Sequence, residues 1–400
     1  MDGIYLDHAA ATPLDPRVEK AMKPFWDTYS GNPGSFHTPG LRAKEAVAGA
    51  RASIASFLKC ADTEILFTSG GTESDNLAVQ GIPRFYAAKG KGKHVITSSI
   101  EHPAVLEPLQ KMAKREEIEL TIVPVGRDGI VDVKTVMDAI RPDTVLVSIM
   151  YANNEIGTIQ PIADIGRAIL KRRKEEKTTL PYLHTDACQA AGALDLDVEK
   201  LHVDAMTING SKIYGPKGVG VLYLRRGVSL EPLIIGGGQE RNLRSGTENV
   251  SAIVGMAAAL ELVQNNREKE NARLEELRDR LIEGLLNIPK SRLNGHPKTR
   301  LPNNANVSFL DIEGEAAILY LDAEGIFVST GSACASHSLD PSHVILATGM
   351  SYEAAHGSIR FSLGKGTTKS DVDTVIKVMP GVVERLRKLS PVNLDMKHFS

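Results

Sequence analysis

One lysine lies in a short segment whose neighbours can make its amine reactive. Residues 210–218 read GSKIYGPKG and follow the apolar run DAMTIN, so Lys212 comes directly after a strand-like segment. A lysine that Gly, Pro and Tyr shield from solvent has a lowered pKa and can form a Schiff base with a carbonyl compound. Lys217 is the weaker candidate in the same segment. Because most lysines are solvated surface charges, Lys212 needs partners elsewhere in the chain to support this role.

A glycine-rich segment follows another strand-like run. After EILFT, residues 69–76 read SGGTESDN, and an apolar helical pattern comes next. Glycines at such a junction let backbone N–H groups converge on an anion at a helix N-terminus, and Thr72, beside Gly71, adds a hydroxyl. The Gly-Lys-Ser/Thr ending of a nucleotide P-loop and the spacing of a dinucleotide fingerprint are both missing. The segment predicts a phosphate site, and an N-cap in a tight turn explains it equally well.

A carboxylate ends a third run. PYLHTDA closes with Asp186, and Gln189 lies just beyond it. A carboxylate at this place can keep a heterocyclic nitrogen protonated, which the ring of pyridoxal phosphate needs in order to accept electrons. Strand alternation also puts His184, Asp186 and Cys188 on one face, which is a pattern of metal ligands. Since no other cluster of His and Cys supplies the missing ligands, we expect no metal site.

Two further strand ends carry polar side chains. His102, in SIEHP, offers a flat ring that can stack on a cofactor and transfer protons near neutral pH. Asn153 and Asn154 follow TVLVSIMYA and supply amide donors for a phenolic oxygen or a carboxylate. Helix capping for the histidine and a turn for the asparagines are the structural alternatives.

Two residues are candidates for substrate binding. Arg360, in SIRFSLG, can bind a carboxylate through two parallel hydrogen bonds, a geometry that lysine cannot reproduce. A structural ion pair is the alternative for this arginine. Asn32 and His37, in GNPGSFH, belong to a turn that could close over the same pocket, although turn chemistry alone explains the Asn-Pro-Gly sequence.

The three cysteines, at positions 60, 188 and 334, are far apart in sequence. An odd number of separated thiols suits a reducing compartment and fits neither a disulfide framework nor a paired-cysteine zinc site. Cys334 lies in STGSACASHS, a run of small residues from which a thiol can swing into a site, attack, and carry a product away. With an ordinary pKa of about 8.5 this thiol needs local help to ionise. Cys60 we expect to be structural.

The elements that must position these residues alternate along the chain. Short apolar runs rich in β-branched residues, most of them separated by helical intervals, indicate a mainly parallel sheet covered by helices on both faces. The runs are EILFT, KHVITSS, LTIVPV, TVLVSIM, PYLHTDA, DAMTIN and VGVLYLR. Ligands bind beyond the carboxyl ends of such strands, which is where the candidate residues lie.

A helical stretch from Glu248 to about Leu286 leads into a second unit. After it, NNANVSFL, GIFVST and SIRFSLG read as strands of a second sheet, and residues 368–389 read as a covering helix that we expect to be interrupted near Pro380. The N-terminal segment should pack on this unit as well.

We therefore predict two domains. Residues 15–257 form a large α/β domain, and residues 1–14 and 258–400 form a smaller α+β domain that carries the cysteine loop. A chain of 400 residues with 42% hydrophobic content is long enough to bury such cores.

Composition narrows the range of partners. Because 47 basic side chains face 49 acidic ones, for a net charge of −2, no global field attracts nucleic acid or an anionic membrane. No stretch approaches the roughly 18 apolar residues of a spanning helix, and the start MDGIYLDHAAATP lacks a leader pattern. We expect a cytoplasmic protein with neither membrane nor nucleic acid as a primary partner.

Ordered motifs along nearly the whole chain resemble those of the cysteine desulfurase family, the NifS/IscS-like members of the class V aminotransferase group. They are YLDHAAATP, GNPGSFH, TSGGTESDN, EHPAVL, NNEIGTIQP, HTDACQ, GSKIYGPKG, RSGTEN, TGSACAS and SIRFSLG. The resemblance implies the type I fold of enzymes that use pyridoxal 5'-phosphate, with a seven-stranded, mainly parallel sheet, and a homodimer. It implies that sulfur leaves L-cysteine, giving L-alanine and a persulfide on Cys334, and passes to an acceptor or iron–sulfur scaffold protein.

The resemblance also implies roles for single residues around the cofactor ring. Lys212 is the Schiff-base lysine, Asp186 contacts the pyridine nitrogen, and His102 stacks on the ring. Gln189 and Asn154 lie near the ring oxygen.

At the phosphate the resemblance implies contacts from Gly71, Thr72 and, from the other subunit, Thr247. The family commonly has Ser-x-His before the lysine, where this chain has Asn209 and Ser211. Both can donate hydrogen bonds, so we expect the phosphate site to survive with altered contacts.

The resemblance implies that Arg360 binds the substrate carboxylate, and Asn154 and Asn32 are the other candidates for contact with the substrate. A selenocysteine lyase or another class V aminotransferase is an alternative function for the chain. A non-catalytic protein of this fold that acts as a sulfur-transfer scaffold is another.

Overall fold

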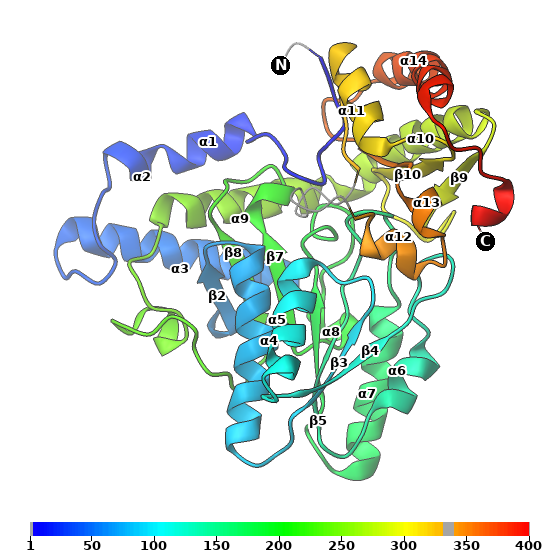
Figure 1. Cartoon of the computed structure of the whole chain (residues 1–400). Helices are drawn as coiled ribbons and strands as arrows, with labels where there is room; N and C mark the ends of the chain where they lie inside the picture. The colour runs from blue at the N-terminus through cyan, green and yellow to red at the C-terminus, as the bar shows by residue number, and fades with distance from the viewer. Residues whose placement is uncertain (1–2, 331–339, 400) are drawn as a thin grey trace.

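The computed structural model describes residues 3–330 and 340–399, and its largest element is a seven-stranded sheet (Figure 1). The strand order is β2-β8-β7-β6-β5-β3-β4. The strands are β2 (Ile65–Thr68), β3 (His94–Ser98), β4 (Glu119–Val123), β5 (Thr144–Ser148), β6 (Tyr182–Asp186), β7 (Ala205–Asn209) and β8 (Gly220–Leu224). Each lies within one of the seven predicted runs or extends it by a single residue, so these predictions are confirmed.

The sheet is mainly parallel. The pairs that link β3, β4, β5, β6 and β7 are parallel, whereas β8 runs antiparallel to both β2 and β7. Every residue of β3, β5, β6 and β8 is buried. Burial on both faces explains why these strands read as continuous apolar runs, and the predicted fold class is confirmed.

Helices cover both faces of this sheet (Figure 1). Helices α4 (Gly71–Ala88) and α5 (Pro103–Lys114) pack on one face, and α3 (Thr38–Leu58), α7 (Ile162–Glu176) and α9 (Val250–Asn265) pack on the other. The alternation of strand side chains divides the two cores: Val221 joins the core under α3 and α9, and Leu222 joins the core under α4 and α5. The shorter helices of this unit are α1 (Pro16–Met22), α2 (Pro24–Asp27), α6 (Val133–Ala139) and α8 (Val198–Leu201).

The second unit contains a three-stranded antiparallel sheet of order β12-β10-β9 and a two-stranded parallel sheet, β1-β11. The strands are β1 (Ile4–Tyr5), β9 (Ser291–Asn294), β10 (Asn304–Phe309), β11 (Ile326–Phe327) and β12 (Ser358–Ser362). The pairing of β1 with β11 confirms that the N-terminal segment packs here. The expectation that residues 325–330 share a sheet with β10 and β12 is wrong, because within the described residues β11 pairs with β1 and only an isolated bridge from Ser329 to Arg360 reaches β12. The helices are α10 (Arg267–Leu286), α11 (Gly314–Ala323), α12 (His343–Ala347), α13 (Tyr352–Ala355) and α14 (Lys369–Leu389).

The helical stretch expected from residue 248 to residue 286 is two helices, α9 and α10, that meet at Asn266. Ile253 and Val263 of α9 join the core of the large sheet, and Leu277 and Leu281 of α10 join the core of the second unit. The predicted division into residues 15–257 on one side and 1–14 with 258–400 on the other stays a prediction.

The expected interruption of the last helix near Pro380 is wrong, because α14 continues through this residue. A proline inside a helix costs about 3 kcal/mol, since it removes one hydrogen bond and crowds the preceding turn. Burial of the apolar face of α14 offsets that cost. The buried residues of that face are Val372, Val375, Met379, Val382, Val383 and Leu386.

Long helices in this chain are not membrane spans. Across residues 3–330 and 340–399, no helix combines the length and the apolar character that crossing a bilayer requires.

Candidate active site

Most of the predicted site residues line one cavity of about 230 Å³ at the carboxyl ends of the central strands. Its lining includes these predicted residues: Gly71, Thr72, His102, Asn154, Asp186, Gln189, Asn209, Lys212 and Arg360. Ala9, Ala10, Asp75, Met150 and Cys188 complete it. Segments from the N-terminus, the large sheet and β12 of the second unit thus meet at this cavity.

Lys212 ends a single 3-10 turn, η2 (Gly210–Lys212), that follows β7 directly. Its Nζ donates hydrogen bonds to the carbonyl oxygens of Ala9 at 2.9 Å and Ala10 at 2.5 Å. The Ala9 oxygen also accepts a hydrogen bond from Nε2 of Gln189 at 2.9 Å. The N-terminal segment therefore holds the amine at the cavity wall through its backbone.

Two carboxyl groups, Asp186 and Asp75, lie close to each other on the same wall. Asp186 ends β6, is buried, and accepts a hydrogen bond from the backbone N–H of Cys188 at 2.8 Å. Asp75, in the first turns of α4, is also buried, and its Oδ1 has no hydrogen-bond partner in the described part of the chain. Burial, and then the charge of Asp186, raise the pKa of Asp75 well above its ordinary value. Both effects favour the protonated form of Asp75.

His102 is the N-cap of α5, and its Nδ1 accepts a hydrogen bond from the backbone N–H of Ala104 at 3.0 Å. Burial lowers the pKa of His102, although the nearby charge of Asp186 acts in the opposite direction. The lowered pKa favours the neutral ring, and a neutral ring whose Nδ1 accepts a hydrogen bond carries its hydrogen on Nε2. The capping role given as the structural alternative is present, and it coexists with a position in the cavity.

The start of α4 is arranged for an anion. The helix begins at Gly71, and no side chain caps its N-terminus. A Cβ atom on Gly71 would lie 2.8 Å from Sγ of Cys188 and 3.3 Å from Cβ of Asn209, so only glycine lets the helix start so close to the ends of β6 and β7. The exposed N–H groups and the helix dipole favour a phosphate here.

Arg360, on β12, reaches the cavity from the second unit. Its guanidinium donates from Nη2 to Oδ1 of Asp7 at 2.8 Å and from Nη1 to the carbonyl oxygen of Asn154 at 3.1 Å. The side chain is 2% exposed, and its buried Nε has no hydrogen-bond partner among the described residues. The structural ion pair that was the alternative for Arg360 is thus present. The guanidinium still has N–H groups that can donate further hydrogen bonds.

The two asparagines after β5 have different roles. Asn153 is fully buried, and its Oδ1 accepts hydrogen bonds from the backbone N–H groups of Glu155 and Ile156, as expected of a turn residue. Asn154 lines the cavity.

Three predicted residues do not line this cavity. Asn32 is exposed, and its Oδ1 accepts a hydrogen bond from the backbone N–H of Gly34 within a turn. Thr247 is exposed in the segment before α9. Ser211 contacts the N-terminal segment, since its carbonyl oxygen accepts hydrogen bonds from the backbone N–H and Oγ1 of Thr12. Cys334 lies outside the described residues.

The other two thiols are held in their neutral form. Burial raises the pKa of Cys60 to about 12, and the neighbouring Glu64 adds to the effect. Burial also raises the pKa of Cys188 well above its ordinary value.

His184 is occupied within the sheet. Its Nδ1 lies 2.9 Å from Oγ of Ser148 and its Nε2 lies 3.1 Å from Oγ1 of Thr207, and burial lowers its pKa to about 4. Among residues 3–330 and 340–399, no group of three or more His, Cys, Asp or Glu side chains is arranged to hold a metal ion.

Asp7 and Asp75 are the two acidic residues at the site that the sequence analysis did not predict. Asp75 left a signal, because it lies on the apolar face of its helix, in line with Ala78 and Val79, where a carboxyl group is out of place. No local sequence pattern indicates a role for Asp7, because its contact with Arg360 joins opposite ends of the chain.

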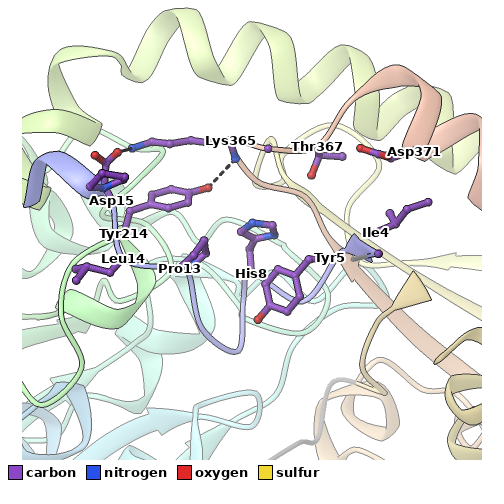
Figure 2. Close-up of a pocket in the computed structure, with 13 residues that line it drawn as sticks. Ile4, Tyr5, His8, Pro13, Leu14, Asp15, Tyr214, Lys365, Thr367 and Asp371 are labelled. Atoms are coloured by element: carbon purple, nitrogen blue, oxygen red, sulfur yellow. Dashed lines mark hydrogen bonds and ion pairs between the residues drawn. The ribbon is translucent and has the colours of Figure 1, made fainter. Parts of the chain in front are cut away.

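A second cavity, of about 310 Å³, is lined by the N-terminal segment and by residues that follow Lys212 and β12 (Figure 2). Nζ of Lys365 lies 3.1 Å from Oδ2 of Asp15, and the backbone N–H of Lys365 donates to the hydroxyl of Tyr214 at 2.9 Å. The first contact links the start of α1 to the residues after β12, and the second links those residues to the turn after Lys212.

Comparison with known proteins gives consistent results over almost the full chain. The family model for class-V aminotransferases matches residues 4–375. The chain is 50% identical to a cysteine desulfurase IscS of Methanosarcina thermophila, over 97% of this chain and 94% of that protein. It is 48% identical to cysteine desulfurase IscS 1 of Archaeoglobus fulgidus, over 97% and 99% of the two chains.

Solved structures show the same likeness. A NifS-like protein has a TM-score of 0.88 and 37% identity and is matched over 96% of this chain and 100% of that chain. A structure described as SspA in complex with cysteine has a TM-score of 0.77 and 34% identity, over 90% and 98%.

Proposed function

This chain belongs to the class-V aminotransferase family and, within it, to the cysteine desulfurases, and from that premise we propose how its residues release sulfur from L-cysteine. The proposed products are L-alanine and an enzyme persulfide, and the proposed cofactor is pyridoxal 5'-phosphate. One observation carries the proposal: Lys212, Asp186, His102 and Arg360, from four separate segments of the chain, line a single cavity.

The cavity fits this cofactor. The family uses pyridoxal phosphate, which requires an amine, an anion partner for the ring nitrogen and a phosphate site. Lys212 supplies the amine, Asp186 the carboxylate, and the uncapped start of α4 at Gly71 the anion site, with Asn209 beside it. When bound, the cofactor supplies an aldehyde for the lysine and a ring that withdraws electrons from the substrate.

Each side chain then has a task of its own. His102 lines the cavity, and its Nε2, the ring nitrogen that is not engaged with Ala104, exchanges protons in the proposed reaction. Arg360 and Asn154 hold the carboxylate of the substrate. Lys212, whose Nζ donates to the carbonyl oxygens of Ala9 and Ala10, would hold the cofactor through its aldehyde, and the lysine amine would take up or return a proton.

We propose Cys334 as the sulfur acceptor. The thiols of Cys60 and Cys188 are unsuited, because burial keeps both protonated. In the proposed step the Cys334 thiolate attacks Sγ of the substrate, an S–S bond forms as the C–S bond breaks, and the carbon side keeps the electron pair and gains a proton. The outer sulfur of the Cys334 persulfide then passes to an acceptor or iron–sulfur scaffold protein in the cytoplasm.

We also propose a homodimer in which Thr247 of one subunit contacts the phosphate held by the other. Thr247 is exposed, and Ile235, which lies in the segment just before it, has an exposed fraction of 84%. So exposed a large apolar side chain suits contact with a second copy. Asn32, in another exposed turn, is the remaining candidate for contact with a substrate from the partner side.

The proposal is tested by product analysis with L-cysteine, a thiol reductant and no added keto acid. Stoichiometric alanine and sulfide are expected from the native protein. The Cys334→Ala variant should bind cofactor and cysteine yet release no sulfide, and Lys212→Ala should lose the cofactor absorbance. Full turnover by Cys334→Ala rejects the acceptor, and a requirement for a keto acid favours an aminotransferase.

A further inference from the structure

The carboxylate of Asp7 accepts one of the hydrogen bonds that the guanidinium of Arg360 can donate. Oδ1 of Asp7 accepts the hydrogen bond from Nη2 at 2.8 Å, and the exposed fractions of the two side chains are 22% for Asp7 and 2% for Arg360. The carbonyl oxygen of Asn154 accepts from Nη1 at 3.1 Å. The guanidinium is therefore fixed from two sides, while its buried Nε lacks a partner in the described part of the chain.

Asp7 is held in place by contacts that do not involve its own side chain. The backbone N–H of His8 donates to the carbonyl oxygen of Ser362 at 3.3 Å, and that of Ala9 donates to Oγ of Ser362 at 2.9 Å. The hydroxyl of Tyr5 donates to the carbonyl oxygen of Asp7 at 3.1 Å. Removal of the Asp7 carboxylate should therefore leave the path of the N-terminal segment unchanged.

We propose that Asp7 is a positioning residue for substrate binding. It orients the guanidinium of Arg360 so that the Nη hydrogens not bonded to Asp7 or Asn154 meet the carboxylate of an α-amino acid. This inference rests on the proposed role of Arg360 as the anchor of that carboxylate. Two parallel hydrogen bonds to a carboxylate require a fixed plane of the guanidinium, and a buried arginine without a counter-ion adopts other orientations.

Substitution of Asp7 has two opposing effects, which two variants separate. Asp7→Ala removes the acceptor that orients Arg360 and also removes a negative charge that repels the substrate carboxylate. Asp7→Asn removes the charge, keeps one oxygen that can accept from Arg360, and replaces the other oxygen by an NH2 group. If the inference is correct, the loss of orientation outweighs the loss of repulsion. Asp7→Ala should then raise KM for L-cysteine about tenfold or more, while kcat changes less than about threefold. Asp7→Asn should restore KM to within about threefold of the native value.

A matched control lies in the same segment. Asp15 also makes ion pairs, with Arg17 at 2.8 Å and with Lys365 at 3.1 Å, and Figure 2 shows the second of these. Among the described residues, Arg360 is not one of its ion-pair partners. Asp15→Ala is expected to lower the melting temperature and to leave KM unchanged. An equal rise of KM in this variant would show that a loosened segment, and not a reoriented arginine, causes the effect.

Competition by two small amines gives a readout independent of turnover. L-Alanine carries the carboxylate, and ethylamine lacks it. Asp7→Ala should weaken the inhibition constant of L-alanine about tenfold and leave that of ethylamine unchanged. A lower KM in Asp7→Ala, or equal losses for both amines, overturns the inference.

The Arg360→Lys variant distinguishes this inference from the proposed function. If Arg360→Lys still binds L-alanine with native affinity, the proposed substrate anchor itself fails. If Arg360→Lys loses that affinity and Asp7→Ala keeps it, the substrate anchor stands and the positioning role of Asp7 is rejected.

Discussion

Burial decides the protonation state of the groups around the cavity. Glu101, immediately before His102, accepts hydrogen bonds from Oγ of Ser98 and the backbone N–H of Met150, yet burial raises its pKa to about 8. The same desolvation lowers the pKa of His102. Acid and base groups with shifted pKa values thus lie side by side at one strand end, as is common in catalytic sites.

Glu101 should make the protein less stable as the pH rises. Its pKa is about 8 in the folded chain and about 4.3 in an unfolded one, so the folded state binds the extra proton between these values. Its contribution is complete below about pH 4 and is lost as the pH rises through 8. Urea unfolding of the native protein should show a decrease of about 2 kcal/mol from pH 6 to pH 8 from this group, and Glu101→Gln should lack that part of the decrease. Parallel pH profiles for the two proteins would contradict the assignment.

Gly71→Ala should weaken the affinity for pyridoxal phosphate. The added Cβ would lie 2.8 Å from Sγ of Cys188, which forces the start of α4 away from the cavity. Equilibrium titration should show a dissociation constant at least about tenfold larger, as expected for overpacking of a close-packed site. The double variant Gly71→Ala with Cys188→Ala should recover part of the affinity.

Gly49→Ala in α3 is the matched control, since a Cβ there meets no atom within 4 Å. It should keep native affinity and stabilise the fold by about 0.5–1 kcal/mol, because alanine loses less backbone entropy than glycine in a helix. Unchanged cofactor affinity in Gly71→Ala would contradict the phosphate site.

Among the elements, helix starts and strand ends do most of the positioning. Lys212 and Asp186 stand at the ends of parallel neighbours β7 and β6, and His102 and Gly71 open α5 and α4. Their order in the sheet, and not their distance in the sequence, brings them together. The short N-terminal segment is the exception, because it crosses to the site from the second unit.

Replacing Pro380 should stabilise α14. This residue is exposed in the middle of a continuous helix, and alanine restores the missing hydrogen bond. Pro380→Ala is expected to raise the free energy of unfolding by about 1–3 kcal/mol. Pro391→Ala, beyond the end of α14, should change it by less than about 0.5 kcal/mol. Equal effects at both positions would show that the proline does not strain the helix.

At the scale of the whole molecule, the proposed contact of Thr247 with the phosphate requires a dimer, because this residue comes from the other subunit. Ile235→Asp should disrupt the proposed dimer, because a charge would then enter an apolar contact. Sedimentation is expected to show a monomer and cofactor titration a weaker affinity. Leu319→Asp on α11, whose native side chain is 72% exposed, is the control that should remain dimeric. A dimer of unchanged stability in Ile235→Asp would place the interface elsewhere.

The sequence by itself determined the large sheet and most of the cavity. Seven apolar runs predicted seven strands, and the polar residues after them, such as Lys212, Asp186 and His102, line the cavity as expected. Strand alternation and glycine-rich junctions are local patterns, and parallel strands bring their carboxyl ends to one edge.

Only the tertiary structure decided which groups support those residues. Three contacts join segments that are distant in sequence: the hydrogen bond from Lys212 to Ala9, the ion pair of Asp7 with Arg360, and the approach of Asp75 to His184. The continuation of α14 through Pro380 likewise depends on burial against a neighbouring core. Local patterns carry no record of such contacts, because packing free energy arises between elements and overrides the preference of a single residue.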